Sequence, residues 1–493
     1  MSDDISRRRL LKSTVAASLV GQLPIAAFTA PAFAAEARRP SDKVEQLTRF
    51  IESTPRGNLI EGVARQVRDG LEYNELLAAL LLAGVRNIEP RPAVGFQFHA
   101  VLVVHAAHLT SLSSPVEDRW LPVFWTLDNF KSSQATDANK GVDWKMKALD
   151  DSDLPGVDGS VKTFKKAMDS WNEGAADLAT ASLSRSLKPP QLFELFVRYA
   201  ARDLRSIGHK AIFMANGFRA LETIGWEHSE SILRSLTYAM LNRSGEPNPS
   251  ENDLEQDRPW RRNLKLADSI RKEWKEGQQN DAATRELLAT MRSGSADDAS
   301  DHVVKLLNDK VSPQSVFDAL FVGAGELLMR QAGIPAIHAV TTMNAVHYLY
   351  QNTNDDNTRR MLLLQGAAFI PLFRKFMLSR GAAGEVLIDQ LESVAGDWTV
   401  NDLLETDNAQ QRAGRAIHAL GDPQVAKKLI DQIRRRTFLQ GRDAHHYKFN
   451  AAALEDYGNI SPNWRSRFLA SSLGYVPSGA ENQLVKRIRA ALS

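Results

Sequence analysis

The sequence predicts an all-α protein with a helical repeat architecture of about four related multi-helix modules packed around a central site. From Val44 onward, apolar residues recur at three- and four-residue spacing, which marks one face of a helix, and no segment alternates as a half-buried strand would. Prolines and short polar segments fall between these apolar blocks rather than inside them. Three of the predicted helices carry a histidine just after such a break. These observations together predict the fold class.

Residues 1–34 have the features of a twin-arginine export signal. Three arginines and a Leu-Leu-Lys sequence (residues 7–12) precede an apolar run (residues 15–28), and Ala-Phe-Ala at 32–34 fits a cleavage site. The apolar run contains a glycine and a proline and is shorter than the ~20 residues that a membrane-spanning helix needs. We therefore expect cleavage, export to the periplasm or the cell exterior, and no membrane anchor afterwards.

The remaining residues, 35–493, are predicted to form one all-helical domain built of repeats. Its length of roughly 460 residues exceeds the ~250–300 at which a single hydrophobic core stops growing. Approximate module boundaries are 44–150, 160–245, 283–380 and 400–493. In the first three modules, an apolar helix rich in small residues precedes the histidine helix and another apolar helix follows it. The histidine helices lie much farther apart than the ~34–47 residues of ordinary helical solenoids, so each module contains several helices.

The composition excludes several classes of protein. Without the four basic and two acidic residues of the signal, the 61 basic and 59 acidic residues of the chain become 57 and 57. This balance gives no broad charged surface for nucleic acid or for an anionic membrane. The chain has no cysteine, which excludes disulfides, thiolate zinc sites, cysteine-bound iron–sulfur clusters and a cysteine nucleophile. An exported chain without disulfides is held together by packing, or by packing and a metal.

The histidines are the most informative residues, because the chain has only 11 of them. The three related helices begin at or near His99, His209 and His338, and a weaker fourth copy begins near His445 and His446. Each histidine taken alone is consistent with a hydrogen-bonded core residue. If the modules pack around a common centre, however, equivalent positions meet there and four imidazoles converge. Imidazole binds iron, copper, zinc and nickel, and the absence of cysteine leaves only nitrogen and oxygen donors.

Lys448 lies three residues after His445, so both side chains share one helix face. A lysine that is desolvated beside a metal loses its proton readily and can act as a base or nucleophile. A neutral lysine can also take up carbon dioxide and become a carbamate, which is an anionic oxygen ligand. A surface lysine on the final helix is equally consistent with the sequence. The sequence leaves open whether His445 or His446 completes the group, and the spacing to Lys448 is the only guide.

Four further residues are candidates for a pocket around this centre, together with His446. His108 and His347 follow His99 and His338 by nine residues, or ~13 Å along a helix, which is too far for them to bind the same metal. Asp203 and Glu326 precede the second and third histidine helices and are candidates to orient metal-bound imidazoles. Core packing for the two histidines and ion pairs with arginines for the two carboxylates are the alternatives.

The chain resembles the questin oxidase-like family over roughly residues 60–475. The resemblance lies in the helical repeats, in Phe98-His99-Ala100, Gly208-His209-Lys210 and Ile337-His338-Ala339, and in the late segment Asp443-Ala-His-His-Tyr-Lys448. It implies an oxygen-dependent enzyme that acts on anthraquinones or related polyketides. A ring-cleaving relative holds a non-haem iron with four histidines and a carboxylated lysine. By position, the resemblance implies that the histidine ligands are His99, His209, His338 and His445 and that the carboxylated lysine is Lys448. Members of this family are mostly cytoplasmic, so the export signal of this chain is a departure that leaves the substrate class open.

We therefore predict an exported oxidoreductase that uses Fe(II), or another first-row transition metal, to activate dioxygen against a small organic, aromatic or polyketide-like substrate. One alternative is a non-enzymatic helical repeat protein that binds a periplasmic partner. Another is a haem protein with two histidine ligands. No nucleic-acid partner is expected, and the sequence predicts no oligomeric state.

Overall fold

The computed structural model describes residues 40–90, 97–139, 144–243 and 245–493. Within these ranges every regular element is helical, and the one β contact is an isolated bridge between Gln278 and Val311. The predicted all-α class is therefore confirmed. The described residues belong to one compact unit. The predicted export signal lies outside the described residues.

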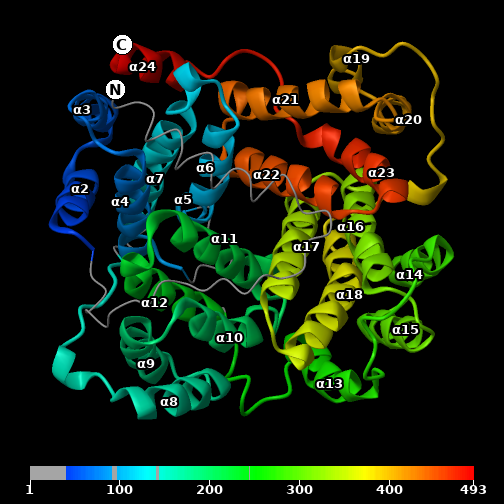
Figure 1. Ribbon diagram of the computed structural model, residues 1–493, viewed down its shortest axis with the longest axis horizontal. Helices are drawn as coiled ribbons and strands as arrows, with labels where there is room; N and C mark the ends of the chain where they lie inside the picture. The colour runs from blue at the N-terminus through cyan, green and yellow to red at the C-terminus, as the bar shows by residue number, and fades with distance from the viewer. Residues whose placement is uncertain (1–39, 91–96, 140–143, 244) are drawn as a thin grey trace. The chain divides into compact units, whose positions relative to one another are not determined.

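The helices follow one another along the chain (Figure 1). The first half contains α2 (Asp42–Ser53), α3 (Arg56–Arg68), α4 (Tyr73–Asn87), α5 (His99–Leu102), α6 (Val104–Leu112), α7 (Leu121–Asn139), α8 (Val157–Asp169), α9 (Glu173–Ser186), α10 (Pro189–Ala200), α11 (His209–Ile224), α12 (Ser229–Met240) and α13 (Arg258–Leu266). The second half contains α14 (Asp281–Ser293), α15 (Ala296–Asn308), α16 (Pro313–Arg330), α17 (Ile334–Asn352), α18 (Asp356–Leu378), α19 (Val400–Leu404), α20 (Ala409–Ala419), α21 (Pro423–Gln440), α22 (Ala444–Asn459), α23 (Pro462–Ser472) and α24 (Gln483–Leu492). Short 3₁₀ turns lie at Val116–Asp118, Asp151–Asp153, Arg205–Gly208, Trp226–His228, Glu255–Asp257, Ala267–Ser269, Ile388–Gln390 and Leu473–Tyr475.

Many of these helices begin at a residue that caps their first turn. The side chains of Asn172, Asn280, Asp355 and Asp443 accept hydrogen bonds from the first backbone N–H groups of α9, α14, α18 and α22. These N–H groups have no partner inside the helix, so the caps stabilise each helix start by about 0.5–2 kcal/mol. The start of α22 matters for the site, because its cap, Asp443, lies two residues before His445.

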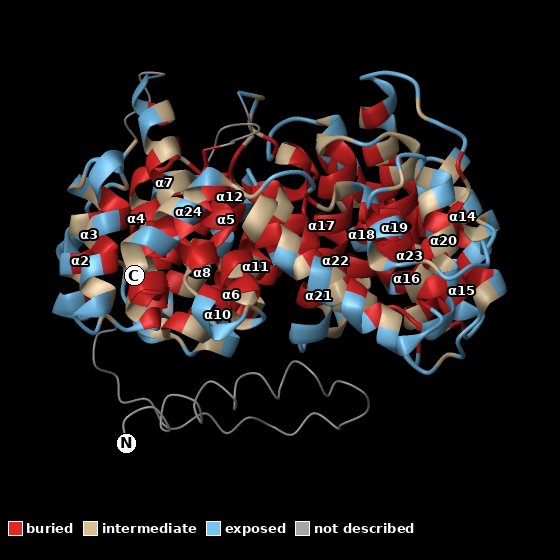
Figure 2. Ribbon diagram, turned by 90° about the horizontal axis from the view of Figure 1, so that it is seen from above, coloured by how far each residue is buried: buried red, intermediate tan, exposed pale blue. Residues whose placement is uncertain are grey.

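Helices α16, α17 and α18 contact one another and are buried along most of their length (Figure 2). An 18-residue window of α18 has a mean hydropathy of 1.4, so this helix is long and apolar enough to cross a membrane. However, 72% of that window is buried inside the protein. Its apolar surface is thus already covered, and we assign α18 as a core helix.

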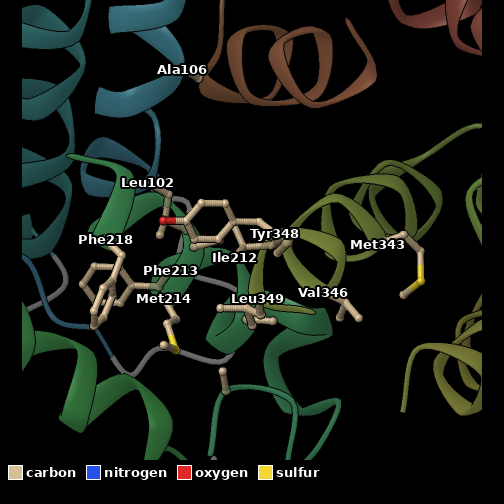
Figure 3. Packing of buried hydrophobic residues seen from close by; sticks show 14 of the residues in the cluster. Leu102, Ala106, Ile212, Phe213, Met214, Phe218, Met343, Val346, Tyr348 and Leu349 are labelled. Carbon is tan, nitrogen blue, oxygen red and sulfur yellow. The ribbon is translucent and has the colours of Figure 1, made fainter. Parts of the chain in front are cut away.

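Four helices enclose the region where the predicted site residues lie. Helix α11 contacts α6 and α17, and α22 contacts α17 and α6, so the four helices close a ring (Figure 1). Helix α5 precedes α6 directly, with Val103 between them. Figure 3 shows part of the buried apolar cluster to which Leu102, Ala106, Ile212 and Tyr348 contribute from these helices. Each of the four predicted modules supplies one helix of the ring, although the relation between the modules stays a prediction.

Candidate metal centre

Three of the predicted histidines lie together at the beginnings of their helices. His99 is the first residue of α5, His209 is the first residue of α11, and His338 is the fifth residue of α17. The Nε2 atom of His209 lies 2.8 Å from Nε2 of His99 and 3.1 Å from Nε2 of His338. The three side chains are buried, and one nitrogen from each fits within a 4.8 Å group. They form a candidate three-histidine metal site.

The fourth histidine beside this group is His445 and not His446. The ring of His445 lies 4.4 Å from that of His99 and 5.2 Å from that of His338, measured between centroids. His446 instead packs against Tyr475, and its Nδ1 accepts a hydrogen bond from the backbone N–H of Arg442. The position of its ring therefore favours His445 over His446 as the fourth member of the group.

Backbone carbonyls fix the protons on two of the imidazoles. The Nδ1 atom of His209 lies 2.5 Å from the carbonyl oxygen of Ser206, and Nδ1 of His338 lies 2.7 Å from that of Ile334. A carbonyl only accepts hydrogen bonds, so Nδ1 of each ring carries the proton and Nε2 of each neutral ring carries a lone pair. The Nε2 atoms of His209 and His338, 3.1 Å apart, therefore face each other as two acceptors.

This arrangement is unfavourable for two neutral imidazoles alone and favourable around a shared cation. Burial lowers the pKa of His99 and His338 well below the usual range and lowers that of His209 to about 3. His99, His209 and His445 also stand in the first turn of their helices, where the partial positive charge opposes protonation. The rings are thus held in the neutral state that a metal requires of its imidazole ligands.

A strained turn places the carbonyl that binds His209. Ser206, Ile207 and Gly208 have φ values of 56°, 50° and 84°, all in the left-handed region. A β-branched residue such as Ile207 rarely adopts this conformation, and such positions cost about 1–3 kcal/mol each. At Gly208, a Cβ atom would lie 2.0 Å from Oγ1 of Thr342 on α17. Glycine is therefore required for the close approach of α11 to α17.

Buried ionic and polar contacts hold this turn in place. Asp203 accepts hydrogen bonds from the backbone N–H of Arg205, at 2.9 Å, and from Nζ of Lys210, at 2.8 Å. Asn242 donates to the Ser206 hydroxyl, at 3.0 Å, and its carbonyl accepts from Lys210. Burial lowers the pKa of Lys210 to about 8. The energy of these contacts offsets the strain of the turn.

Asp203 and Glu326 form ion pairs, which was the alternative role considered for them. Asp203 binds Lys210 and the turn, and Glu326 pairs with Arg292 at 2.9 Å. Neither carboxylate orients an imidazole, because carbonyls at the preceding turn or within the same helix occupy Nδ1 of His209 and His338. A different carboxylate, Asp443, lies beside an imidazole of the group, with its Oδ1 3.2 Å from Nδ1 of His445.

Lys448 is buried beside the histidines and is 4% exposed. Its Nζ finds no hydrogen-bond partner among the residues that the structure describes. Burial lowers the pKa of Lys448 to about 7. The pKa of His99 is lowered first by its own burial and second by the positive charge of Lys448. A buried amine without a partner is costly, which is consistent with a ligand or a modification at this position.

The two other predicted pocket histidines pack elsewhere. Nδ1 of His108 lies 3.1 Å from the hydroxyl of Tyr73. The ring of His347 packs edge-on against Phe317 and Phe321, with centroids 4.7 and 5.2 Å away. These contacts are those of core residues, which was the alternative role considered for them.

No family model, curated protein or solved structure is significantly similar to the chain. The resemblance to the questin oxidase-like family therefore stays a hypothesis that rests on the residues themselves.

Proposed function

We propose that the protein is an oxidoreductase that uses a histidine-bound metal, Fe(II) or another first-row transition metal, to activate dioxygen against a small organic substrate. The observation that carries this proposal is the pair of facing acceptors, Nε2 of His209 and Nε2 of His338, 3.1 Å apart. A cation between them and His99 would turn a repulsive contact into a favourable one.

The donor set fits such a metal. His99, His209, His338 and His445 would supply imidazole nitrogens, and all four are at least 91% buried. Imidazole without thiolate suits iron, copper, nickel or zinc, and iron is the one among these that our sequence hypothesis favours. Lys448, as a carbamate, would add an anionic oxygen. When bound, the metal would supply the one-electron chemistry with dioxygen that amino acid side chains lack.

The protein's own residues contribute positioning and desolvation. The carbonyls of Ser206 and Ile334 set the orientation and tautomer of His209 and His338. Asp443 does the same for His445, and such outer contacts commonly change metal affinity by about 10–100-fold. Burial separates the histidines from bulk solvent and lowers the pKa of Lys448 to about 7, where the amine readily loses its proton.

Metal analysis of the natively exported protein tests the proposal. We expect about one first-row metal per chain, in keeping with one donor group, and loss of this metal in the His209→Ala and His338→Ala variants. The exposed His418 is the matched control, because His418→Ala leaves the donor group intact. Absence of stoichiometric metal, with unchanged thermal stability in both cluster variants, would contradict the proposal. A Soret absorption band would instead favour haem, for which two Nε2 atoms about 3 Å apart leave no room between them.

A further inference from the structure

A narrow cavity runs between α6, α11, α17 and α22, and we call it the seam. Its lining includes Lys448 and, seven residues later on α22, Glu455, so it extends ~10 Å along that helix at 1.5 Å per residue. Arg219 of α11 and Asn344 of α17 line it beside Glu455. One end of the seam therefore reaches the amine beside the histidines, and the other reaches a polar group.

The polar end opens toward solvent. Arg219 donates two hydrogen bonds of 2.8 Å to the carboxylate of Glu455, and Asn344 donates a third. The side chain of Glu455 is 37% exposed. The carboxylate of Glu455 thus reaches solvent, whereas the side chain of Arg219 is 9% exposed and forms the inner side of the pair. The Arg219–Glu455 pair thus stands at the mouth of the seam.

The seam is kept open by small side chains, but it is narrow. Alanines line it on three of the four helices: Ala106 on α6, Ala345 on α17, and Ala451 and Ala452 on α22. Its volume is about 20 Å³. A water molecule needs roughly 10–15 Å³ by the same measure, whereas pockets for organic ligands hold about 300–1,000 Å³. The seam therefore has room for a molecule of two or three atoms and excludes an organic substrate.

Two buried polar atoms belong to residues that line the seam. Neither Nζ of Lys448 nor Nδ1 of His105 has a hydrogen-bond partner among the described residues. Buried polar atoms in folded proteins nearly always have partners, and bound water supplies them where the protein does not. The cavity that touches both residues is large enough for such a molecule. The small residues that line the seam and the unpartnered amine of Lys448 thus indicate that a small molecule from solvent occupies the seam.

We propose that the seam is a passage that admits water and linear molecules of two or three heavy atoms, such as dioxygen or carbon dioxide, to the Lys448 amine and the adjoining histidines. Organic molecules reach the site by another route. The inference of a passage rests only on the cavity and the residues that line it. Its use as a supply of dioxygen to a metal rests on the proposed function.

Cyanate provides a direct test on the full-length chain after dialysis against a chelator. Its conjugate acid, isocyanic acid, is a linear molecule of three heavy atoms. A bond forms between Nζ and its carbon, the C=N bond becomes single, and one amine proton moves to that nitrogen, which leaves a stable carbamoyl group. We expect peptide mass spectrometry to find Lys448 carbamoylated by cyanate but not modified by the bulky reagent trinitrobenzenesulfonate. The exposed Lys162 should react with both reagents.

Closing the seam should protect Lys448 selectively. In Ala451→Leu we expect carbamoylation of Lys448 to slow by about tenfold, the effect of about 1.4 kcal/mol on a barrier, while Lys162 reacts as before. Ala175→Leu is the matched control, because Ala175 is also a partly buried alanine against the core but lies on α9 and outside the seam. Ala106→Val, on the opposite wall, replaces Ala451→Leu if that variant does not fold.

Three results would overturn the passage: no reaction of Lys448 with cyanate in the wild-type chain, an equal rate in the closed-seam variants, or equal modification by the bulky reagent. Metal content measured on each preparation before dialysis against the chelator keeps the two proposals apart. If the chain binds no metal but Lys448 shows the seam-dependent reaction, the passage is supported and the proposed function is contradicted. If the chain binds metal in the histidine group but Lys448 does not show that reaction, the proposed function is supported and the passage is contradicted.

Discussion

At the scale of single residues, Gly208 determines how closely α11 approaches α17. Its φ of 84° is left-handed, and an added Cβ would meet Oγ1 of Thr342 at 2.0 Å. We expect Gly208→Ala to lower the free energy of unfolding by about 2–5 kcal/mol, from left-handed strain of about 1–2 kcal/mol and overpacking of about 1–3 kcal/mol. Denaturant unfolding measures this change, and metal content should fall with it, because His209 follows directly.

Gly70 offers a matched control for this prediction. It also has a left-handed φ, of 95°, but an added Cβ would meet nothing within 4 Å. Gly70→Ala should therefore cost only the conformational strain of about 1–2 kcal/mol and leave metal content unchanged. Equal losses of stability in the two variants would show that the contact with Thr342 is not what requires glycine at position 208.

At the scale of helices, the start of α22 connects a cap to a histidine of the group. The Asp443 side chain accepts a hydrogen bond of 2.7 Å from the backbone N–H of His445 and lies 3.2 Å from its Nδ1. We expect Asp443→Ala to lower stability by about 0.5–2 kcal/mol through the lost cap. It should also weaken metal binding by about 10–100-fold, because the imidazole loses the carboxylate that orients it.

Asp355 separates these two effects. It caps α18 with a hydrogen bond of 2.7 Å from the backbone N–H of Thr358 and, among the described residues, forms no hydrogen bond or ion pair with a histidine. Asp355→Ala should lose stability comparable to that of Asp443→Ala and keep its metal affinity, as measured by competition with a chelator. Similar metal affinities in both variants would mean that Asp443 acts only as a cap.

At the scale of the whole molecule, the sequence predicted the helices and the four histidines that converge, but not the groups that orient them. Helix periodicity and the recurrence of His99, His209 and His338 are local signals that one sequence carries. The left-handed turn at Ser206–Gly208 is not predictable in this way, because Ile207 disfavours that conformation and buried contacts from Asp203 and Asn242 impose it. The ion-pair partners of Asp203 and Glu326 are not predictable for a related reason, since packing decides which cations lie beside them.

The buried histidines make the stability of the whole chain depend on pH. Burial lowers the pKa of His108 to about 4 and of His209 and His347 to about 3, and it lowers that of His99 and His338 well below 6.5. In the unfolded chain these histidines bind protons as pH falls below about 6.5, whereas in the folded chain they do not. Stability is therefore fully present above that pH and is lost as pH falls from about 6.5 toward 3.

At pH 5.5, one unit below the ordinary value, each of the five histidines lowers the stability by on the order of 1 kcal/mol, and the five together by several kcal/mol. This loss is comparable with the whole stability of a typical domain, about 5–15 kcal/mol, so we expect cooperative acid unfolding of the metal-free chain between about pH 6 and 5. Circular dichroism against pH measures the midpoint. Bound metal holds the cluster histidines unprotonated and should move the midpoint to lower pH, and replacing the core residue His347 with glutamine should move it in the same direction. A midpoint that does not respond to either change would mean that groups other than these histidines control the acid transition.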